Sequence, residues 1–424
     1  MKFSALDLAP EIQQALDASG YSQMTPVQEQ AIVPARRGKD LLANAQTGTG
    51  KTAAFSLPIL QQMVDRPQPT ESGYPRALIL TPTRELAEQL ADTIKRYAQF
   101  LPLNVTALYG GVNMEGQAKK LKTGVDVLIS TPGRLLEHVV QCNVSLAKVE
   151  FAVLDEADRM LDMGFVADVS TLLQQTSSHR QTLMFSATIS PTVNELAKQL
   201  MNKHEVIRVA KVNATADTVE HVVYPVEEKR KADLFAELID KHQWFQVLVF
   251  TSTKAQADEL MTDLKIDGIP AVVCHGDKTQ GSRRRAIADF KEGKIQVLVA
   301  TEVAARGLDI QGLELVVNYN LPYLAEDYVH RIGRTGRAGA KGKAISFVSR
   351  EEEQALDNIE YLIGARIKRI NMPGYEVGSR DNLRKTIKKK VRKFKTKSNK
   401  ATKTKILRSK AGTSKPSAKK KKNR

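Results

Sequence analysis

The sequence predicts an α/β protein with two tandem domains, each built on a parallel β-sheet, followed by a basic tail. Three observations support this fold class. At 424 residues the chain is too long for one ordinary domain. Continuous apolar runs alternate with helical patterns, which indicates a parallel sheet covered on both faces. The same alternation starts again after a polar stretch at 212–220.

The first predicted domain spans residues 1–210 and the second spans 219–375, with a polar linker at 211–218. A helix is expected at 254–264. Ligands of open parallel sheets bind beyond the carboxyl ends of the strands, so functional residues are expected in the loops that follow them. The predicted strands are DLLANA (40–45), RALILT (76–81), DVLIST (126–131), FAVLDE (151–156) and QTLMFSAT (181–188), then HVVYPV (221–226), QVLVFTST (246–253), AVVCHG (271–276), IQVLVAT (295–301), LVVNYN (315–320) and AISFVS (344–349).

The net charge of +17 comes entirely from the C-terminal tail. Residues 384–424 hold 20 Lys and Arg and no Asp or Glu, which leaves 44 basic against 47 acidic side chains and a net charge of −3 elsewhere. A segment of this composition cannot bury enough apolar surface to fold alone. We therefore expect the tail, 376–424, to be disordered in isolation.

Cysteine usage and hydropathy exclude several classes of protein. Cys142 and Cys274 lie far apart, which excludes a metal-ligand cluster or a disulfide framework and suits a reducing compartment. The N-terminus lacks a basic segment followed by an apolar one, and no apolar run of about 18 residues occurs. We expect a soluble, cytoplasmic protein that does not contact membranes.

A phosphate-binding loop is predicted directly after the first strand, in AQTGTGKTAAF (45–55). This segment matches the pattern GxxxxGK[ST] except that Ala45 replaces the first Gly. Backbone N–H groups converge on phosphate oxygens in such a loop, while Lys51 supplies a cation and Thr52 a hydroxyl for Mg²⁺. The flanking strand and helix favour this interpretation over a chance glycine-rich turn. The candidate nucleotide-binding residues are Ala45, Gln46, Thr47, Gly48, Thr49, Gly50, Lys51 and Thr52.

Three carboxylates follow the predicted strand 151–156, at Asp155, Glu156 and Asp158. In proteins with a phosphate loop, an Asp at the end of a later strand holds Mg²⁺, and Asp155 stands in that place. We expect it to act through a water, as Mg²⁺ prefers. Glu156 is placed to orient and deprotonate the water that attacks the γ-phosphate. Without a phosphate loop elsewhere in the chain, the tetrapeptide DEAD (155–158) would be interpreted as an ordinary acidic start of a helix.

The ordered set of motifs resembles the DEAD-box family of ATP-dependent RNA helicases, and most of all its bacterial RhlE type. The resemblance covers about residues 1–375 and implies two RecA-like domains. It also implies that Phe3 and GYSQMTPVQ (20–28) form an adenine-reading motif, in which Gln28 bonds the adenine edge and Tyr21 stacks on the ring. An amide suits adenine, because the base edge offers both a donor and an acceptor.

The resemblance further implies RNA-contacting and coupling motifs in both domains, among them PTREL (82–86), TPGR (131–134) and QGSR (280–283). Hydroxyls, arginines and backbone N–H groups in loops suit a sugar-phosphate strand and carry no sequence information. SAT (186–188) resembles the motif that couples ATP binding to unwinding. The candidate RNA-binding residues are Arg84, Gly111, Thr131, Gly133, Arg134, Thr251, Gly276, Gln280, Arg283 and Thr301, and the candidate coupling residues are Asp158, Ser186, Thr188 and His330.

The second domain lacks a phosphate loop and offers cations instead, in HRIGRTGR (330–337). The resemblance implies that Arg334 and Arg337 are arginine fingers, because a planar, permanently charged fork suits transferring phosphoryl oxygens. Asp309, in ARGLD, is expected to touch the ATP ribose. The sequence departs from the family pattern in two places: Glu302 replaces the usual Asp, and Asn320 stands where an acid is common. Their effect on coupling stays open.

The predicted activity is ATP-dependent unwinding of short RNA duplexes, with ATP and Mg²⁺ as cofactors. ATP attracts Arg334 and Arg337, and closure joins two RNA half-sites, so each ligand favours the binding of the other. The predicted partner is RNA, as a single strand or short duplex, contacted through its backbone. Two alternatives stay open: a DNA helicase or translocase, and an RNA clamp or assembly scaffold with slow turnover.

The pathway and the role of the tail stay open as well. Ribosomal precursors and RNA-decay proteins are candidate partners, and cold adaptation is an equally open context. The tail is either a solubilising charge run or an RNA anchor, and we weigh the two equally. A nuclear-localisation role for KKKK fits poorly with a bacterial-type body.

Overall fold

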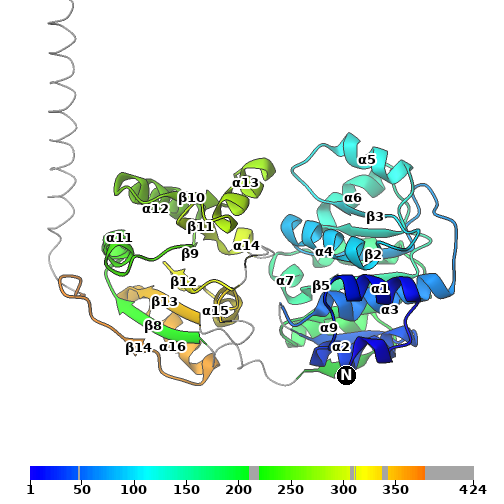
Figure 1. Ribbon diagram of the computed structural model, residues 1–424, viewed down its shortest axis with the longest axis horizontal. Helices are drawn as coiled ribbons and strands as arrows, with labels where there is room; N and C mark the ends of the chain where they lie inside the picture. Colours follow the sequence, from blue (N-terminus) through cyan, green and yellow to red (C-terminus); the bar gives the residue numbers. More distant parts are fainter. Residues whose placement is uncertain (46–47, 210–218, 306–309, 311, 337–341, 378–424) are drawn as a thin grey trace, which may run out of the picture.

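Two α/β domains of the same topology lie side by side (Figure 1). The computed structural model describes residues 1–45, 48–209, 219–305, 310, 312–336 and 342–377. Within these residues each domain holds a seven-stranded sheet, and the strand pairs in both sheets are parallel. The predicted fold class is thereby confirmed. In the described part of the chain, no helix combines the length and apolar character that a bilayer crossing requires.

The first sheet has the strand order β3-β4-β2-β5-β6-β1-β7. Its strands are β1 (Leu41–Asn44), β2 (Ala77–Leu80), β3 (Val105–Leu108), β4 (Val127–Ser130), β5 (Phe151–Asp155), β6 (Gln181–Ser186) and β7 (Glu205–Arg208). The helices of this domain are α1 (Pro10–Ala18), α2 (Pro26–Arg36), α3 (Lys51–Asp65), α4 (Arg84–Tyr97), α5 (Met114–Lys122), α6 (Pro132–Val140), α7 (Ala157–Asp162), α8 (Val166–Gln174) and α9 (Pro191–Leu200).

The second sheet has the order β10-β11-β9-β12-β13-β8-β14, which repeats the first order strand for strand. Its strands are β8 (Val219–Pro225), β9 (Val247–Thr251), β10 (Ala271–Cys274), β11 (Val297–Thr301), β12 (Leu315–Asn318), β13 (Gly342–Val348) and β14 (Lys368–Arg369). The helices are α11 (Lys231–His242), α12 (Lys254–Ile266), α13 (Gln280–Lys291), α14 (Glu302–Ala305), α15 (Ala325–Ile332) and α16 (Glu353–Ile363).

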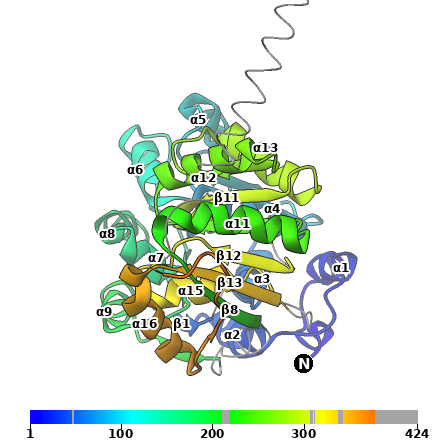
Figure 2. The ribbon, with the colours of Figure 1, turned by 90° about the vertical axis from the view of Figure 1, so that its left-hand side faces the viewer.

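Both faces of each sheet are buried, which explains the continuous apolar runs in the sequence. In β9, Val247 and Val249 pack into the core cluster that contains α11 and α12 residues. Leu248 and Phe250 point to the other face, where α13 packs. Figure 2 shows α11 and α12 lying over the second sheet.

Every predicted strand is present, but β3, β7 and β14 were not predicted. These three strands lie at or next to sheet edges, and their side chains are partly exposed: in β7 only Ile207 is buried, and both β14 residues are exposed. An edge strand needs no continuous apolar run, so this signal fails there.

The predicted domain boundaries stay a prediction, and the linker 211–218 and nearly all of the tail lie outside the described residues.

Parallel pairing gathers the candidate residues at one edge of each sheet and sorts them into two groups. In the first sheet, β5, β6 and β1 are neighbours, and their ends lead to the acidic loop, to SAT and to the phosphate loop. The neighbours β3, β4 and β2 lead instead to three RNA-contact candidates, Gly111, Thr131 and Arg84. The second sheet repeats the latter group, because β10, β11 and β9 lead to Gly276, Thr301 and Thr251.

Candidate functional site

The phosphate loop joins β1 to α3 and is closed by Gly50. Gly50 has a φ of 90°, in the left-handed region that disfavours side chains. A Cβ at this position would lie 2.4 Å from Gln28 Nε2, so the loop has no room for a larger residue. Lys51 then begins α3. Ala45, Gly48, Thr49 and Thr52 lie on this loop as predicted, whereas Gln46 and Thr47 are outside the described residues.

Lys51 and Asp155 meet at the ends of β1 and β5, with 3.2 Å between Nζ and Oδ1. Both side chains are buried. Burial alone lowers the pKa of Lys51, but Asp155, Glu156 and Asp158 together outweigh it and raise this pKa above its usual value. Burial raises the pKa of Asp155, while Lys51 opposes that rise. The site therefore holds a protonated lysine beside a buried carboxylate whose negative charge Lys51 only partly compensates.

Glu156 caps α7 in a left-handed conformation, with a φ of 56°. Its backbone N–H donates to Asp155 Oδ1 at 3.1 Å, and its side chain is partly exposed. Non-glycine residues in this region are strained by roughly 1–3 kcal/mol and cluster at functional sites. The strain thus falls on the residue predicted to activate water.

Asp158 connects the acidic loop to the loop after β6. Its Oδ2 accepts hydrogen bonds from the Thr188 N–H at 2.9 Å and from the Thr188 hydroxyl at 3.1 Å. Its own N–H donates to Ser186 Oγ at 3.3 Å. Three of the candidate coupling residues, Asp158, Ser186 and Thr188, are therefore in contact.

The adenine-reading candidates lie against the phosphate loop. Gln28 is buried; its Oε1 accepts from Thr25 N–H at 2.8 Å, and its Nε2 donates to the Gly50 carbonyl at 3.0 Å. Among the described residues, these two bonds leave one N–H and one lone pair of the amide without a partner. Phe3 is fully buried and packs edge-on against Tyr21, with 5.8 Å between ring centroids. Phe3 thus positions Tyr21 rather than presenting a face of its own.

The first-domain loops of the RNA candidates support one another. The Arg84 guanidinium lies against Gly111, where a Cβ would come within 2.2 Å of Nη1. Arg134 donates to the Val112 carbonyl at 3.2 Å. Thr131 directly precedes α6, and Gly133, in the first turn of that helix, has open space around it.

The RNA-binding candidates Thr251, Thr301 and Gly276 of the second domain differ in their burial and in their contacts within the protein. Thr251 is fully buried, and its hydroxyl donates to the Thr253 carbonyl at 3.3 Å. Thr301 is buried at the end of β11. Gly276 lies next to Lys254, whose Cε would be 3.5 Å from a Cβ at that glycine.

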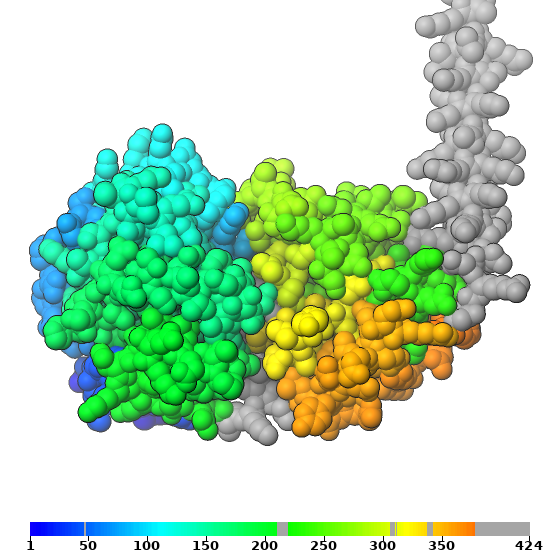
Figure 3. Space-filling model, turned by 180° about the vertical axis from the view of Figure 1, so that it is seen from behind, coloured from blue at the N-terminus to red at the C-terminus, as the bar shows by residue number. Residues whose placement is uncertain are grey.

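Gln280 and Arg283 reach the first domain, and sequence reasoning missed their partner. Gln280 Nε2 donates to Glu85 Oε1 at 3.2 Å, and Arg283 Nη2 lies 2.9 Å from the same oxygen. A second contact joins Arg284 to Glu88, with 3.2 Å between Nε and Oε2. Glu85 belongs to PTREL, so its single carboxylate and the three arginines of QGSRRR were the available signal. Figure 3 shows the two domains in contact.

Helix α15 lies on the side of the second domain that faces α7 of the first (Figure 1). It contains His330 and ends two residues before Arg334. Arg334 is buried, with only 4% of its surface exposed. Arg337 and Asp309 lie outside the described residues. Of the two departures, Asn320 accepts from the Ser252 N–H at 3.2 Å and donates to Glu228 at 3.0 Å, a pair of roles that a carboxylate does not fill.

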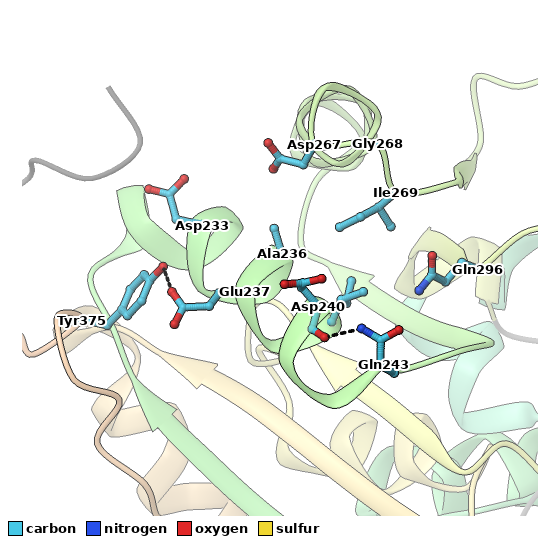
Figure 4. Close-up of a pocket in the computed structure, with 11 residues that line it drawn as sticks. Asp233, Ala236, Glu237, Asp240, Gln243, Asp267, Gly268, Ile269, Gln296 and Tyr375 are labelled. Carbon is cyan, nitrogen blue, oxygen red and sulfur yellow. Dashed lines mark hydrogen bonds between the residues drawn. The ribbon is translucent and has the colours of Figure 1, made fainter. Parts of the chain in front are cut away.

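The second domain also contains a pocket of about 550 Å³ that none of the candidate residues lines. Figure 4 shows four carboxylates around it, from Asp233, Glu237, Asp240 and Asp267. The Tyr375 hydroxyl at its rim donates to Glu237 at 2.8 Å. This pocket contains no part of the predicted site.

Two domains of one topology, the first with a phosphate loop, form the architecture of a two-domain nucleotide-hydrolysing motor. Comparisons with known proteins specify the family. The DEAD/DEAH box helicase family matches residues 25–196, and the helicase conserved C-terminal domain matches residues 230–339. The chain belongs to the DEAD-box family of ATP-dependent RNA helicases.

Curated relatives and solved structures agree with this assignment. The ATP-dependent RNA helicase CshA of Listeria monocytogenes is 41% identical over 90% of this chain and 73% of its own length. The ATP-dependent RNA helicase RhlB of Pseudomonas syringae is 42% identical over 86% of this chain and 94% of its own. The structure of S. cerevisiae Dbp5 bound to RNA and ADP BeF3 has a TM-score of 0.78 and 31% identity, covering 88% of this chain and 97% of Dbp5. Mss116 bound to ssRNA and UDP-BeF has a TM-score of 0.79 and 27% identity, covering 89% of this chain and 81% of Mss116.

Proposed function

We propose that the chain hydrolyses ATP in one site divided between its domains and uses that cycle to release strands from short RNA duplexes. The observation that carries the proposal is the meeting of Lys51 and Asp155, next to an Asp158 that is bonded to Thr188. A phosphate-binding cation, a metal-binding carboxylate and a coupling loop thus occupy neighbouring strand ends. ATP binding and the state of the second domain are linked through this edge of the first sheet.

Thr52 and Asp155 are the proposed holders of Mg²⁺. Burial makes the ionised form of Asp155 costly, and a divalent cation offsets this cost. Apart from its ion pair with Asp155, Lys51 Nζ makes no hydrogen bond within the described residues, which leaves it suited to phosphate oxygens. When bound, Mg²⁺ supplies positive charge to the phosphate oxygens as the γ-phosphate departs.

Glu156 and the second-domain arginines complete the proposed active site. Glu156 orients the attacking water and takes its proton, and its strained backbone supports a functional role. Arg334 and Arg337 stabilise the negative charge that spreads over the transferring phosphoryl group. Asp309 contacts the ribose, and Gln28 with Tyr21 selects adenine.

The RNA strand is proposed to cross from one domain to the other over the matching strand ends. The loops after β3, β4 and β2 form one half-site, and those after β10, β11 and β9 form the other. The similar structures of Dbp5 and Mss116, which are bound to RNA, support this choice of ligand. Closure around ATP joins the two halves, so each ligand favours the other. Backbone contacts that bend one strand then release its partner.

A pair of assays tests the proposed function. ATP hydrolysis is measured with single-stranded RNA and with single-stranded DNA, and greater stimulation by RNA is expected. Release of a short RNA duplex is measured with ATP and with a non-hydrolysable analogue, and repeated turnover with ATP alone is expected. Equal stimulation by DNA would indicate a DNA translocase, and release without repeated turnover would indicate an RNA clamp.

Three finer assignments stay proposals. The chain is proposed to be of the RhlE type, although the relatives described above carry the names CshA and RhlB. Ribosomal precursors or RNA-decay proteins are its proposed partners, with the cytoplasm as the compartment. Crosslinking RNA to the protein in cells and sequencing that RNA tests the first of these partners directly.

A further inference from the structure

Arg331 is a buried arginine to which the proposed function gives no role. It lies in α15, one residue after His330 and three before Arg334. Only 3% of its side chain is exposed. A guanidinium keeps its charge under all ordinary conditions, so a buried one requires partners that satisfy both its charge and its N–H groups.

Four groups from three strand ends surround the Arg331 side chain. Its Nε contacts the Glu302 carboxylate at the start of α14. Its Nη1 donates to the Asn320 carbonyl at 2.7 Å and to Asn318 Oδ1 at 3.2 Å, both at the end of β12. The guanidinium carbon also lies 5.0 Å from the centroid of the Phe250 ring in β9.

These contacts join α15, the helix that precedes Arg334, to the loops of the same domain that carry the RNA-binding candidates. Glu302 directly follows Thr301, the RNA candidate at the end of β11. Asn320, in turn, accepts from the N–H of Ser252, the residue after Thr251. Arg331 therefore links the ends of β9 and β11 directly to α15.

Physical chemistry indicates which feature of this junction matters. Removing the Glu302 charge leaves the Arg331 guanidinium buried without its compensating anion, which is strongly unfavourable. Lysine in place of Arg331 keeps a charge but loses the planar fork that serves three acceptors at once.

We propose that Arg331 is a positioning residue, which, paired with Glu302, sets Arg334 in its working orientation when RNA engages the ends of β9 and β11. This inference rests on the proposed function, because it assigns Arg331 to the RNA stimulation of ATP hydrolysis. Arg331 touches neither ligand. It acts by holding α15 against the strand ends that do.

Four variants test the role of the pair: Glu302→Gln, Glu302→Asp, Arg331→Lys and the control Glu353→Gln. The control removes the charge of another glutamate in the second domain, which pairs with Arg369 at 2.7 Å on the surface. For each variant, kcat and the KM for ATP are measured with and without RNA, together with the midpoint of thermal unfolding.

The pair predicts a loss confined to kcat in the presence of RNA. Glu302→Gln and Arg331→Lys should lower the RNA-stimulated kcat by about tenfold, because a small misplacement of a catalytic group is costly. The KM for ATP measured without RNA should stay within about twofold, since the phosphate loop and Gln28 of the first domain are unchanged. Glu302→Asp, which keeps the charge, should retain most of the stimulated rate, and the control should match the wild type.

Three results would overturn the inference. Full RNA stimulation in Glu302→Gln, even with a lowered unfolding midpoint, would make the pair merely structural. Equal losses in Glu302→Gln and Glu302→Asp would show that the charge is irrelevant. Absence of RNA stimulation in the wild type would refute the proposed function itself, and the inference with it; this outcome is distinguished because it needs no variant.

Discussion

Glu85 of the first domain and Arg283 of the second form an ion pair 2.9 Å long, and both side chains are buried. Gln280 donates to the same carboxylate. Two residues expected to contact RNA, Gln280 and Arg283, thus contact the first domain through Glu85. We infer that Gln280 and Arg283 hold the domains together and shape the RNA half-sites through that contact.

Glu85→Gln should weaken the closed arrangement, because it leaves Arg283 buried without a full counter-charge. RNA affinity in the presence of a non-hydrolysable ATP analogue should fall by about tenfold or more. Glu195→Gln is a matched control, since Glu195 pairs with Lys198 on the exposed surface of the same domain. Unchanged RNA affinity in Glu85→Gln would show that this pair does not contribute to closure.

Asp158→Asn should uncouple unwinding from hydrolysis. The replacement amide turns an N–H toward the Thr188 N–H and hydroxyl, or keeps only part of the present bonding. We expect duplex release to fall by about tenfold while ATP hydrolysis falls much less. Asp162→Asn, which changes an exposed carboxylate on the same helix, is the control. Parallel losses of both activities would contradict a coupling role.

Gly50→Ala should abolish most ATP binding, both by straining the backbone and by placing a Cβ against Gln28. Gly38→Ala is the control, because it strains the backbone without such a clash. Both glycines have left-handed backbones, at φ 90° and 76°, so alanine costs roughly 1–2 kcal/mol at either site. Only at Gly50 does the new Cβ meet Gln28 Nε2, because Gly38 has no neighbour within 4 Å. Titration with a fluorescent ATP analogue should show weakened binding for Gly50→Ala alone, and equal effects would mean that the contact with Gln28 is unimportant.

His138 predicts a loss of stability in mild acid. Its Nε2 lies 3.0 Å from Gln117 Oε1 and its Nδ1 lies 3.3 Å from Asn143 Nδ2, so the neutral ring, with its proton on Nε2, satisfies both partners. Burial lowers the pKa of His138 below 6.5, and Arg134 lowers it further.

Because the folded-state pKa lies below the unfolded one, the stabilisation is complete above pH 6.5 and is lost as the pH falls toward the folded value. The free energy of unfolding should fall by up to about 1.4 kcal/mol per pH unit in that window. Denaturant titrations of His138→Gln should lack this slope, whereas those of His179→Gln, a change at an exposed histidine, should keep it. A slope shared by all three proteins would assign it to other groups.

Deletion after Leu383 should weaken RNA binding and flatten its salt dependence. The removed segment carries 20 Lys and Arg and no acid. Each phosphate contact to a single strand adds about 0.7 to the slope of log affinity against log salt. Hydrolysis of ATP without RNA should stay nearly intact. An identical salt slope with and without the segment would favour a solubilising role.

The sequence predicted the central strands and the first-domain site because both depend on local patterns. FAVL (151–154) is continuously apolar since both faces of β5 are covered, and the loops that follow β1 and β5 carry motif residues at fixed spacing. The ends of β1 and β5, with β6 between them in the sheet, then bring Lys51 to Asp155. Local pattern and global fold agree at this place.

The relationships that the sequence did not predict depend on distant parts of the chain or on partial exposure. The pairing of Glu85 with Arg283 depends on how two domains meet, and no local period encodes that. The contact between Glu302 and Arg331 needs the end of β11 to lie beside α15. The edge strand β7 exposes most of its side chains, so it carries no apolar run.

A single active site, in which Glu156 activates water, should respond to RNA. The most direct measurement is the steady-state rate of ATP hydrolysis for the wild type and Glu156→Gln, each with and without single-stranded RNA. We predict that RNA raises the wild-type rate, and that Glu156→Gln lowers the RNA-stimulated rate by about a hundredfold or more while still binding ATP. A Glu156→Gln protein that hydrolyses ATP at the wild-type rate, or a wild type indifferent to RNA, would contradict the account.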